Sequence, residues 1–376
     1  MKIGFDAKRL YNNFTGLGNH SRTTIDILTE EFPNNEYVLF TPKVSINNIT
    51  LQYLSKKHCK TIQPHGLIKG SLWRTFSLVK ELKKNNIELF HGLSNELPWG
   101  IKKSGIKSIL TIHDVAFKTF PDMYSRIDQM IYDKKWKHAC HEADRIIAIS
   151  ECTKDDIIRY YNVEDNKIDV VYQPVSPIYY NENKKKDLKI LTSLLGENAN
   201  NPYMLYVGSV NSRKNLLGIV QAMERLPKDL QLPLVIVGRG GAYMQTVPSY
   251  ITQHNMEHLF IWLEIFGHEQ LMQLYLNATV FIYPSFCEGF GLPVVEAELC
   301  GCPVVTSNIS SLPEAGGPFA LKANPYDSEE ISSKIEQLLN DSEFRAETAS
   351  QAYQHAMKTF HPSVLAKQLM KVYENI

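Results

Sequence analysis

Short, continuous runs of apolar residues alternate with helix-like segments along nearly the whole chain. In the first half the apolar runs lie at residues 2–6, 37–41, 89–91, 108–113, 145–150 and 169–172. The segments between them predict helices from about residue 21, at 72–83, at 125–142 and from residue 151. Continuous apolar runs, each followed by a helix, are typical of parallel strands that helices cover on both faces. The pattern therefore predicts a doubly wound, mostly parallel α/β sheet.

The pattern is interrupted once and then starts again. Residues 179–201 are polar and lysine-rich, with prolines close by. After them, strands are expected at 203–208, 234–238, 259–266 and 280–283, and helices at 215–225, 244–254, 271–277, 328–340 and from 343 onward except near Pro362. With 376 residues, the chain also exceeds what one hydrophobic core usually serves. We expect domains over 1–175 and 201–360, a linker region over 176–200, a terminal helix over 361–376, and ligand binding in a cleft between the two sheets.

The composition excludes several classes of protein. The chain has 40 basic and 40 acidic residues, which argues against nucleic acid as the main partner. No apolar run approaches the roughly 18 to 20 residues of a membrane span, and the start of the chain lacks the apolar core of a signal peptide, so we expect a cytoplasmic protein. Lysine pairs in the first half leave open a peripheral contact with an anionic membrane, dispersed surface lysines being the alternative. Neither a C-x-x-C pair nor a D-x-D triplet occurs, so no metal site is expected.

The segment 280–305, VFIYPSFCEGFGLPVVEAELCGCPVV, reads as a strand, a glycine-bearing turn, a short helix and a second strand. Glu288 and Glu296 flank the turn and the first part of the helix. Gly289 and Gly291 allow the backbone to approach a ligand closely. The free N–H groups at the start of the helix favour an anion. The segment therefore predicts the donor site of an enzyme that handles a phosphorylated sugar.

Two cations follow the strand that ends at Gly208. Arg213 and Lys214 lie just before the next helix, in SVNSRKNL. Cations at the carboxyl end of a strand, next to a helix start, are suited to hold phosphate groups. A solvated basic turn is the alternative, and the nearby glycine turn with Glu288 favours the phosphate clamp.

Polar residues end two strands of the first half. His113 and Asp114 follow one strand and His91 ends another, so the two histidines are expected to line one wall of the site, a hydrogen-bonded structural histidine being the alternative. Earlier in the chain, Gly16 and Gly18 begin a dinucleotide-binding fingerprint that Ser21 leaves incomplete. Two interpretations of this segment remain open: a glycine loop whose backbone approaches a ligand, and a plain turn.

Seven segments together resemble one known family. They are the E-x7-E signature EGFGLPVVE at 288–296, the following CGCPVVTSNISSLPEAGG, and VGSVNSRKNL, LVIVGRGG, TGLGNHSR, TIHDVAF and IAISECTKDDI. Over nearly its whole length the chain resembles the retaining glycosyltransferases of family 4, which have the two-domain GT-B fold. The resemblance implies two Rossmann-like domains facing a deep cleft. It also implies an acceptor-binding first domain, a donor-binding second domain and a terminal helix that crosses back to the first domain.

The resemblance also implies roles for individual residues. Arg213 and Lys214 would bind the donor diphosphate in place of a metal, and no cofactor is expected. Glu288 would bind hydroxyls of the donor sugar, Glu296 those of the ribose, and His113 would face the sugar near the anomeric carbon. The other residues expected at the donor are Gly16, Gly18, Gly208, Gly267, Gly289, Phe290, Gly291 and Leu292, and those on the acceptor side are His91 and Asp114. At Asn19–His20 the chain departs from the family, which often carries Arg or Lys there.

The expected activity is the transfer of a hexose, with retention, from a nucleotide diphosphate sugar to a saccharide or lipid-linked saccharide in surface polysaccharide synthesis. The pattern RKN…CEGFGLP…SSLPE resembles mannosyltransferases that use GDP-mannose, so mannose is the first expectation and UDP-sugars are the alternative. No residue is an obvious covalent nucleophile, which favours front-face retention. A GT-B sugar-nucleotide epimerase and a non-catalytic nucleotide-sugar binding protein are the competing hypotheses.

Overall fold

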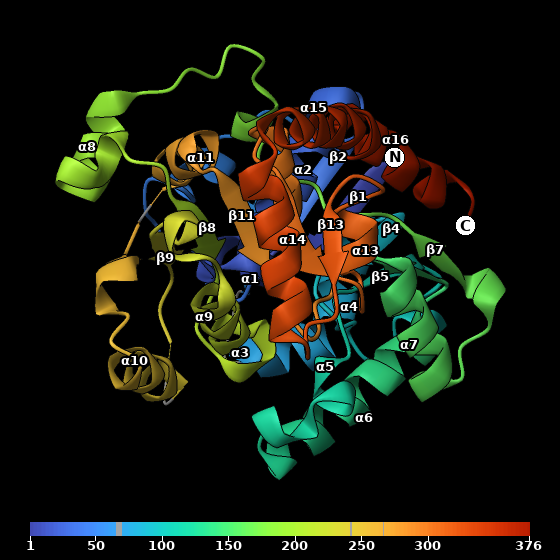
Figure 1. Ribbon diagram of the computed structural model, residues 1–376. Coiled ribbons are helices and arrows are strands. Elements are labelled where there is room, and N and C mark those ends of the chain that lie inside the picture. Colours follow the sequence, from blue (N-terminus) through green and yellow to red (C-terminus); the bar gives the residue numbers. More distant parts are fainter. Residues whose placement is uncertain (65–69, 241–242, 266) are drawn as a thin grey trace. The chain divides into compact units, whose positions relative to one another are not determined.

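The computed structural model describes residues 1–64, 70–240, 243–265 and 267–376, and it divides into two compact units (Figure 1). Unit 1 comprises Met1–Pro174 and Pro362–Ile376, and unit 2 comprises Val175–His361. Gly241, the last residue of the LVIVGRGG segment, and Phe266, the end of one expected strand, lie outside the described residues.

The sheet of unit 1 has seven strands in the order β3-β2-β1-β4-β5-β6-β7, and every neighbouring pair is parallel. Six of its strands lie where continuous apolar runs predict them. The edge strand β3 was not predicted, because its sequence CKTI is mostly polar and only Ile62 is buried. The strands are β1 (Lys2–Asp6), β2 (Glu36–Phe40), β3 (Cys59–Ile62), β4 (Leu89–Gly92), β5 (Lys107–Ile112), β6 (Arg145–Ala148) and β7 (Ile168–Val170).

Helices surround this sheet. They are α1 (Lys8–Asn12), α2 (Gly16–Glu31), α3 (Gly70–Leu72), α4 (Leu78–Lys84), α5 (Ala116–Thr119), α6 (Arg126–Glu142), α7 (Glu151–Tyr161) and α16 (Pro362–Glu374). The expected helix at 72–83 is broken by a π-helical turn, Trp73–Ser77, between α3 and α4. The terminal helix α16 packs against α2, and its Leu369 and Tyr373 share one apolar core with residues of β1, β2 and α2.

Helix α2 begins five residues earlier than the sequence pattern suggests, so Gly16 and Gly18 lie in its first turn rather than in a loop. The Oδ1 atom of Asn13 accepts hydrogen bonds from the N–H groups of Thr15 and Gly18, at 3.1 and 2.9 Å. A Cβ atom at position 18 would lie 1.7 Å from the carbonyl oxygen of Asn13. Glycine is therefore needed at position 18 for helix packing, whether or not a ligand approaches.

The sheet of unit 2 has six parallel strands in the order β10-β9-β8-β11-β12-β13. In chain order this is the Rossmann arrangement 3-2-1-4-5-6, in which the order reverses between β8 and β11. Two short elements were not predicted, β13 and helix α13 (Leu312–Ala315). The strands are β8 (Met204–Val207), β9 (Leu234–Val237), β10 (Phe260–Leu263), β11 (Val280–Tyr283), β12 (Val304–Ser307) and β13 (Leu321–Ala323).

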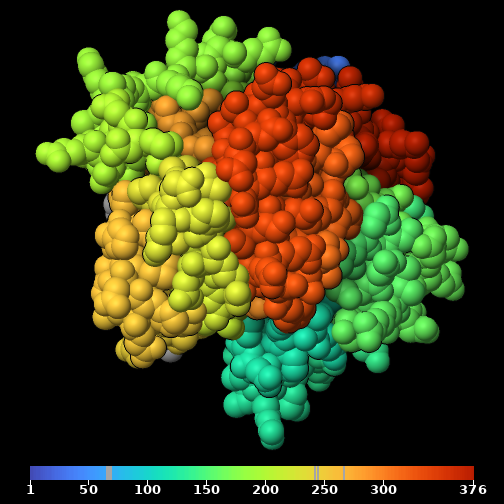
Figure 2. Space-filling view, viewed as in Figure 1, coloured from blue at the N-terminus to red at the C-terminus, as the bar shows by residue number. Residues whose placement is uncertain are grey.

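Helices cover the sheet of unit 2, and Figure 2 shows α8, α9, α10, α14 and α15 on the visible surface of this unit. One of these helices, α8, lies within the expected linker region. They are α8 (Leu188–Leu195), α9 (Leu216–Arg225), α10 (Tyr243–Gln253), α11 (His268–Asn277), α12 (Leu292–Leu299), α14 (Ser328–Asn340) and α15 (Ser342–Thr359). The predicted fold class, two doubly wound parallel α/β units, is confirmed.

Three buried histidines of unit 1 lead to a test of its stability. His20, His91 and His113 are at most 6% exposed, and burial lowers the pKa of each, to about 3 for His91. Among the described residues, neither ring nitrogen of His20 has a hydrogen-bond partner. Histidines that are neutral in the fold stabilise it fully above the unfolded pKa of about 6.5, and this contribution is lost as the pH falls below that value.

We expect His20→Phe to be at least as stable as the parent at pH 7 and less sensitive to acid between about pH 6.5 and 4.5. Each such histidine contributes up to ~1.4 kcal/mol per pH unit in this range. Urea unfolding at a series of pH values measures the difference. An identical pH slope for both proteins would contradict the prediction.

Candidate functional site

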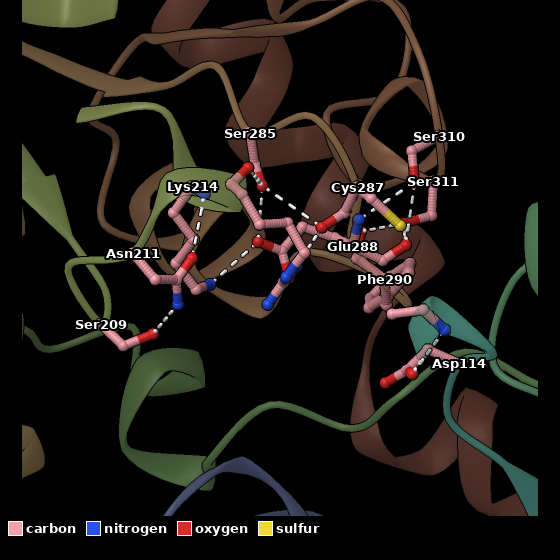
Figure 3. A network of polar contacts seen from close by, with 12 residues as sticks. Asp114, Ser209, Asn211, Lys214, Ser285, Cys287, Glu288, Phe290, Ser310 and Ser311 are labelled. Carbon is pink, nitrogen blue, oxygen red and sulfur yellow. Dashed lines mark hydrogen bonds and ion pairs between the residues drawn. The ribbon is translucent and has the colours of Figure 1, made fainter. Parts of the chain in front are cut away.

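At the switch point of unit 2, where the strand order reverses between β8 and β11, two cations face one carboxylate. Arg213 and Lys214 follow β8, and Glu288 follows the neighbouring strand β11. Nη1 of Arg213 lies 3.0 Å from Oε2 of Glu288. Nζ of Lys214 lies 2.9 Å from Oε1 of Glu288 (Figure 3). The three side chains are 12 to 18% exposed. The structure thus brings together the two parts of the predicted site that lie more than seventy residues apart in the sequence.

Two hydroxyl groups complete the surroundings of the Glu288 carboxylate. Tyr283 and Ser285 donate hydrogen bonds to Oε1 at 3.0 and 2.8 Å, in addition to the bond from Lys214. A carboxylate accepts about four hydrogen bonds in all. Glu288 is therefore already engaged by its own protein, and its main structural role is to hold the two cations in place.

The backbone of Glu288 is fixed as well. Its N–H donates to Oγ of Ser310 at 3.0 Å, and its carbonyl oxygen accepts from Ser310 and Ser311 at 3.0 and 2.8 Å (Figure 3). Both serines follow β12, the next strand of the sheet. The position of the glycine turn is thus set from a third strand end.

Local sequence explains where Arg213 and Lys214 lie. Asn211 accepts a hydrogen bond from the N–H of Lys214 at 3.2 Å, which closes a short helical turn. Asn215 has a φ of 55°, in the left-handed region that Asn tolerates. Its side chain caps α9 at the N–H of Gly218 and donates to the carbonyl oxygens of Pro284 and Pro325, at 3.1 and 2.7 Å. The segment 211–215 is therefore tied directly to the ends of β11 and β13.

Electrostatics keeps Glu288 ionised. Burial alone would raise its pKa, but Lys214 and Arg213 outweigh burial and lower the pKa to about 2. A carboxylate with this pKa is a very weak base at neutral pH. The arrangement is suited to placing positive charge beside an anion and unsuited to general acid–base catalysis by Glu288.

Glu296 lies in a different environment. It is on α12, 9% exposed, and its Oε2 accepts a hydrogen bond from Tyr275 at 3.2 Å. Burial raises the pKa of Glu296 to about 8, so the isolated site holds the protonated acid at neutral pH. The two glutamates of the E-x7-E signature therefore differ in charge as well as position.

The expected donor-binding glycines and their neighbours lie at strand ends and helix starts of unit 2. Gly208 follows β8 beside Lys214, and Gly267 precedes α11 in an extended conformation. Gly291 precedes α12 with a φ of 116°, and a Cβ atom there would lie 2.7 Å from Leu312. Gly289, Phe290 and Leu292 complete the turn between Glu288 and the helix.

In unit 1, His113 directly follows β5 and is fixed from both sides. Its Nε2–H donates to the carbonyl oxygen of Leu93 at 2.8 Å, and its Nδ1 accepts from Gln173 at 2.7 Å. The ring of His20 packs edge-on against it, with centroids 4.6 Å apart. Since burial lowers the pKa of His113, it is a neutral ring whose two nitrogens are already hydrogen-bonded.

His91 and Asp114 also have structural partners. His91 is 1% exposed and contacts the hydroxyls of Tyr373 on α16 and Thr111 on β5, both at 2.7 Å. Asp114 accepts a hydrogen bond from the N–H of Ala116 at 3.0 Å, at the start of α5. His91 therefore fits the alternative of a hydrogen-bonded structural histidine, and its acceptor-side role stays a prediction.

Several residues that build the site were not predicted from the sequence. Glu288 is hydrogen-bonded by Tyr283, Ser285, Ser310 and Ser311. Asn215 anchors the segment 211–215, which carries Arg213 and Lys214. The signal was present, because the serines at 310 and 311 lie in the SSLPE part of a quoted segment. Their hydrogen-bonding partners depend on how three strand ends meet, which the sequence pattern does not specify.

The part of the chain that the structure describes holds no group of three or more His, Cys, Asp or Glu side chains that could bind a metal ion. None of the helices described there is long and apolar enough to cross a membrane.

Two family models match the chain. The one described as glycosyl transferases group 1 matches residues 192–355, and the one described as glycosyltransferase family 4 matches residues 23–177. Among curated proteins, the O-antigen chain mannosyltransferase B of Escherichia coli is 30% identical over 360 residues, which is 92% of each chain. The O-antigen chain mannosyltransferase RfbU of Salmonella typhimurium is 26% identical over 61% of this chain and 60% of its own.

Solved structures share the fold over the full length. The sucrose-phosphate synthase of Thermosynechococcus elongatus matches with a TM-score of 0.79 and 20% identity, covering 100% of this chain and 98% of its own. HepE of Anabaena, solved in complex with UDP and glucose, matches with a TM-score of 0.74 and 19% identity, covering 100% and 99%. At these identities the likeness supports the fold class alone, and that class is GT-B.

The contrast between the two glutamates gives a matched pair of variants. Glu288→Gln removes the charge that compensates Arg213 and Lys214, so the free energy of unfolding should fall by about 3 kcal/mol at pH 7. Glu296→Gln replaces a neutral acid by a neutral isostere and should change the free energy of unfolding by less than about 1 kcal/mol. Urea unfolding at pH 7 measures both values.

The pH dependence provides the control for this pair. A carboxylate whose pKa is lowered on folding stabilises the fold above about pH 4.5, and this contribution is lost as the pH falls toward 2. The difference between the parent and Glu288→Gln should therefore shrink in acid. If both variants lose the same free energy of unfolding at pH 7, the charges assigned to Glu288 and Glu296 are incorrect.

Proposed function

Since the chain belongs to glycosyltransferase family 4, we propose that it transfers a hexose from a nucleotide diphosphate sugar to a saccharide or lipid-linked saccharide, with retention of configuration. The observation that supports this most directly is the pair Arg213 and Lys214 held by Glu288 at the switch point of unit 2. A leaving nucleoside diphosphate gains negative charge as its bond to the sugar breaks. Two fixed cations stabilise that charge without reorganising during the reaction.

Mannose, carried by GDP, is the first candidate for the transferred sugar. The relatives in Escherichia coli and Salmonella typhimurium that are named O-antigen chain mannosyltransferases support it. By the same analogy, the acceptor is a surface polysaccharide under construction. HepE, solved with UDP and glucose, keeps a UDP-sugar as the second candidate.

The roles of the site residues follow from their surroundings. Arg213 and Lys214 stay paired with Glu288 and direct their remaining N–H groups at the donor diphosphate, while Glu288 accepts a sugar hydroxyl at Oε2. Glu296, protonated in the isolated site, binds the ribose hydroxyls as both donor and acceptor. His113 faces the sugar near the anomeric carbon as a fixed polar group, because both of its nitrogens are already hydrogen-bonded.

Retention then needs a base other than these groups. Glu288 is too weak a base, with a pKa of about 2, and His113 has no free nitrogen. A front-face reaction provides one, because an oxygen of the departing phosphate takes the proton of the acceptor hydroxyl as the new glycosidic bond forms. Proton NMR of the product distinguishes retention from inversion through the configuration of the new anomeric centre.

A thermal-shift panel of GDP- and UDP-sugars tests the donor. A ligand that binds only the folded chain raises the melting temperature by mass action. GDP-mannose should give the largest shift and should also be slowly hydrolysed in the absence of acceptor. Binding without hydrolysis or transfer would favour a binding protein, and interconversion of UDP-GlcNAc with its epimer would favour an epimerase.

Removing either cation of the clamp should disable turnover. We expect Arg213→Ala and Lys214→Ala each to lower kcat by roughly 10²–10³-fold, as for the loss of one group that stabilises transition-state charge. Arg225→Ala, which removes an exposed cation of α9 in the same unit, is the matched control and should keep the parent rate. Parent-like rates for both clamp variants would refute the phosphate assignment.

The clamp should also make a divalent ion dispensable. Because Arg213 and Lys214 supply the positive charge, full activity should persist in excess EDTA, and added Mg²⁺ or Mn²⁺ should change kcat by less than about twofold. Steady-state transfer assays with and without chelator measure this. Activity that disappears with EDTA and returns with Mg²⁺ would contradict it.

A further inference from the structure

A second charged cluster lies at the switch point of unit 1, and the proposed donor site does not use it. The order of that sheet reverses between β1 and β4, and ligands of such sheets bind above this point. Asp6 is the last residue of β1, and Glu96 follows β4 by four residues. Arg74, from the π-helical turn, bridges them: its Nε lies 3.2 Å from Oδ2 of Asp6, and its Nη2 pairs with Glu96.

The cluster extends from the core to the surface. The side chains of Asp6 and Arg74 are 4 and 7% exposed, while Glu96 is 23% exposed. Lys135 on α6 is 41% exposed, and its Nζ lies 3.6 Å from Oε2 of Glu96. Lys8 also interacts electrostatically with Asp6, Arg74 and Glu96. Glu96 and Lys135 therefore form the solvent-facing end of a network of acids and bases.

An exposed aromatic pair adjoins this end. The rings of Phe76 and Trp99 meet edge to face with centroids 5.5 Å apart, and the residues are 56 and 43% exposed. The N–H of Trp99 donates to the carbonyl oxygen of Thr75 at 2.9 Å, and its ring lies 4.8 Å from that of His138. We call Phe76 and Trp99 the aromatic ledge.

The ledge and the cluster are parts of one surface. Glu96 and Trp99 lie three residues apart in one loop, and Lys135 and His138 lie three residues apart on α6. Glu96 contacts Lys135 and Trp99 contacts His138, so the loop and α6 meet at both places. Arg74 and Phe76 also share the π-helical turn, with one side chain buried in the cluster and the other exposed. Such turns are rare and are often found at functional sites.

This combination matches the surface of a pyranose. A sugar ring has an apolar C–H face, which packs on aromatic rings, and a rim of hydroxyls, which donate to carboxylates and accept from ammonium groups. The surface end of the cluster supplies both kinds of hydroxyl partner, because Glu96 accepts hydrogen bonds and Lys135 donates them. We propose that Phe76, Trp99, Glu96 and Lys135 form a subsite for a neutral saccharide, the acceptor of the transfer; this rests on the proposed function.

A binding experiment tests the subsite without relying on catalysis. Saturation-transfer NMR of the full chain with methyl α-D-mannopyranoside and an α-linked mannobiose should show contact in the parent. The signals should fall sharply in Trp99→Ala and Phe76→Ala and recover in part in Trp99→Phe. Ile127→Ala, which removes a 70% exposed side chain from α6, is the control and should keep the parent signals.

The transfer assay separates this proposal from the proposed function. Trp99→Ala should raise the acceptor KM roughly tenfold, which corresponds to about 1.4 kcal/mol, and leave slow donor hydrolysis unchanged because the donor residues lie in unit 2. A parent enzyme that neither hydrolyses nor transfers any donor would refute the proposed function, while the NMR result would still decide the subsite. Unchanged saccharide signals and KM in Trp99→Ala would overturn the subsite.

A lipid surface is the competing occupant of the ledge. Vesicles of phosphatidylglycerol and phosphatidylethanolamine test it by co-sedimentation with the parent and Trp99→Ala. Saccharide binding that persists in Trp99→Ala while vesicle binding disappears would overturn the proposal in favour of membrane contact. Vesicle binding that is equal in both proteins, together with the loss of saccharide signals, would support it.

Discussion

The ion pairs between Glu288 and the cations Arg213 and Lys214 determine the layout of the candidate site in unit 2. Two positive charges side by side repel each other, and the free energy of placing them together falls only because a carboxylate lies between them. Glu288 can fill that place because Tyr283, Ser285, Ser310 and Ser311 fix its side chain and backbone. The two cations are thus held in place in advance, so the diphosphate of the proposed donor would meet fixed charges rather than a flexible pair of side chains.

The ionisable groups show how surroundings, rather than residue type, decide chemistry. Glu288 and Glu296 are eight residues apart, yet paired cations lower the pKa of the first to about 2 and burial raises that of the second to about 8. His113 is neutral and has both nitrogens engaged. Neither Glu288 nor His113 is prepared to move a proton at neutral pH, which supports the proposal that the site acts through fixed charge and position.

Much of the fold and the centre of the site could be predicted from the sequence. Continuous apolar runs located eleven of the strands, because a strand buried on both faces leaves no room for polar residues. Arg213, Lys214 and Glu288 could be found because each follows such a run directly. The edge strand β3 could not be predicted, because its sequence is mostly polar. The π-helical turn could not be predicted either, because it lies inside a segment whose pattern is that of a regular helix. The burial of His91 depends on Tyr373, 282 residues away, which no local pattern specifies.

The two units place charges at equivalent points of the same topology, and the balance of those charges differs. At the switch point of unit 2, two cations share one carboxylate, which leaves an excess of positive charge for an anion. At the switch point of unit 1, the carboxylates of Asp6 and Glu96 lie among the cations Arg74, Lys135 and Lys8, and exposed aromatic rings adjoin them. On the two proposals made above, the same strand order serves the diphosphate of a donor in unit 2 and a ring-shaped saccharide in unit 1. The difference depends on a few side chains at strand ends, so a change of substrate needs no change of fold.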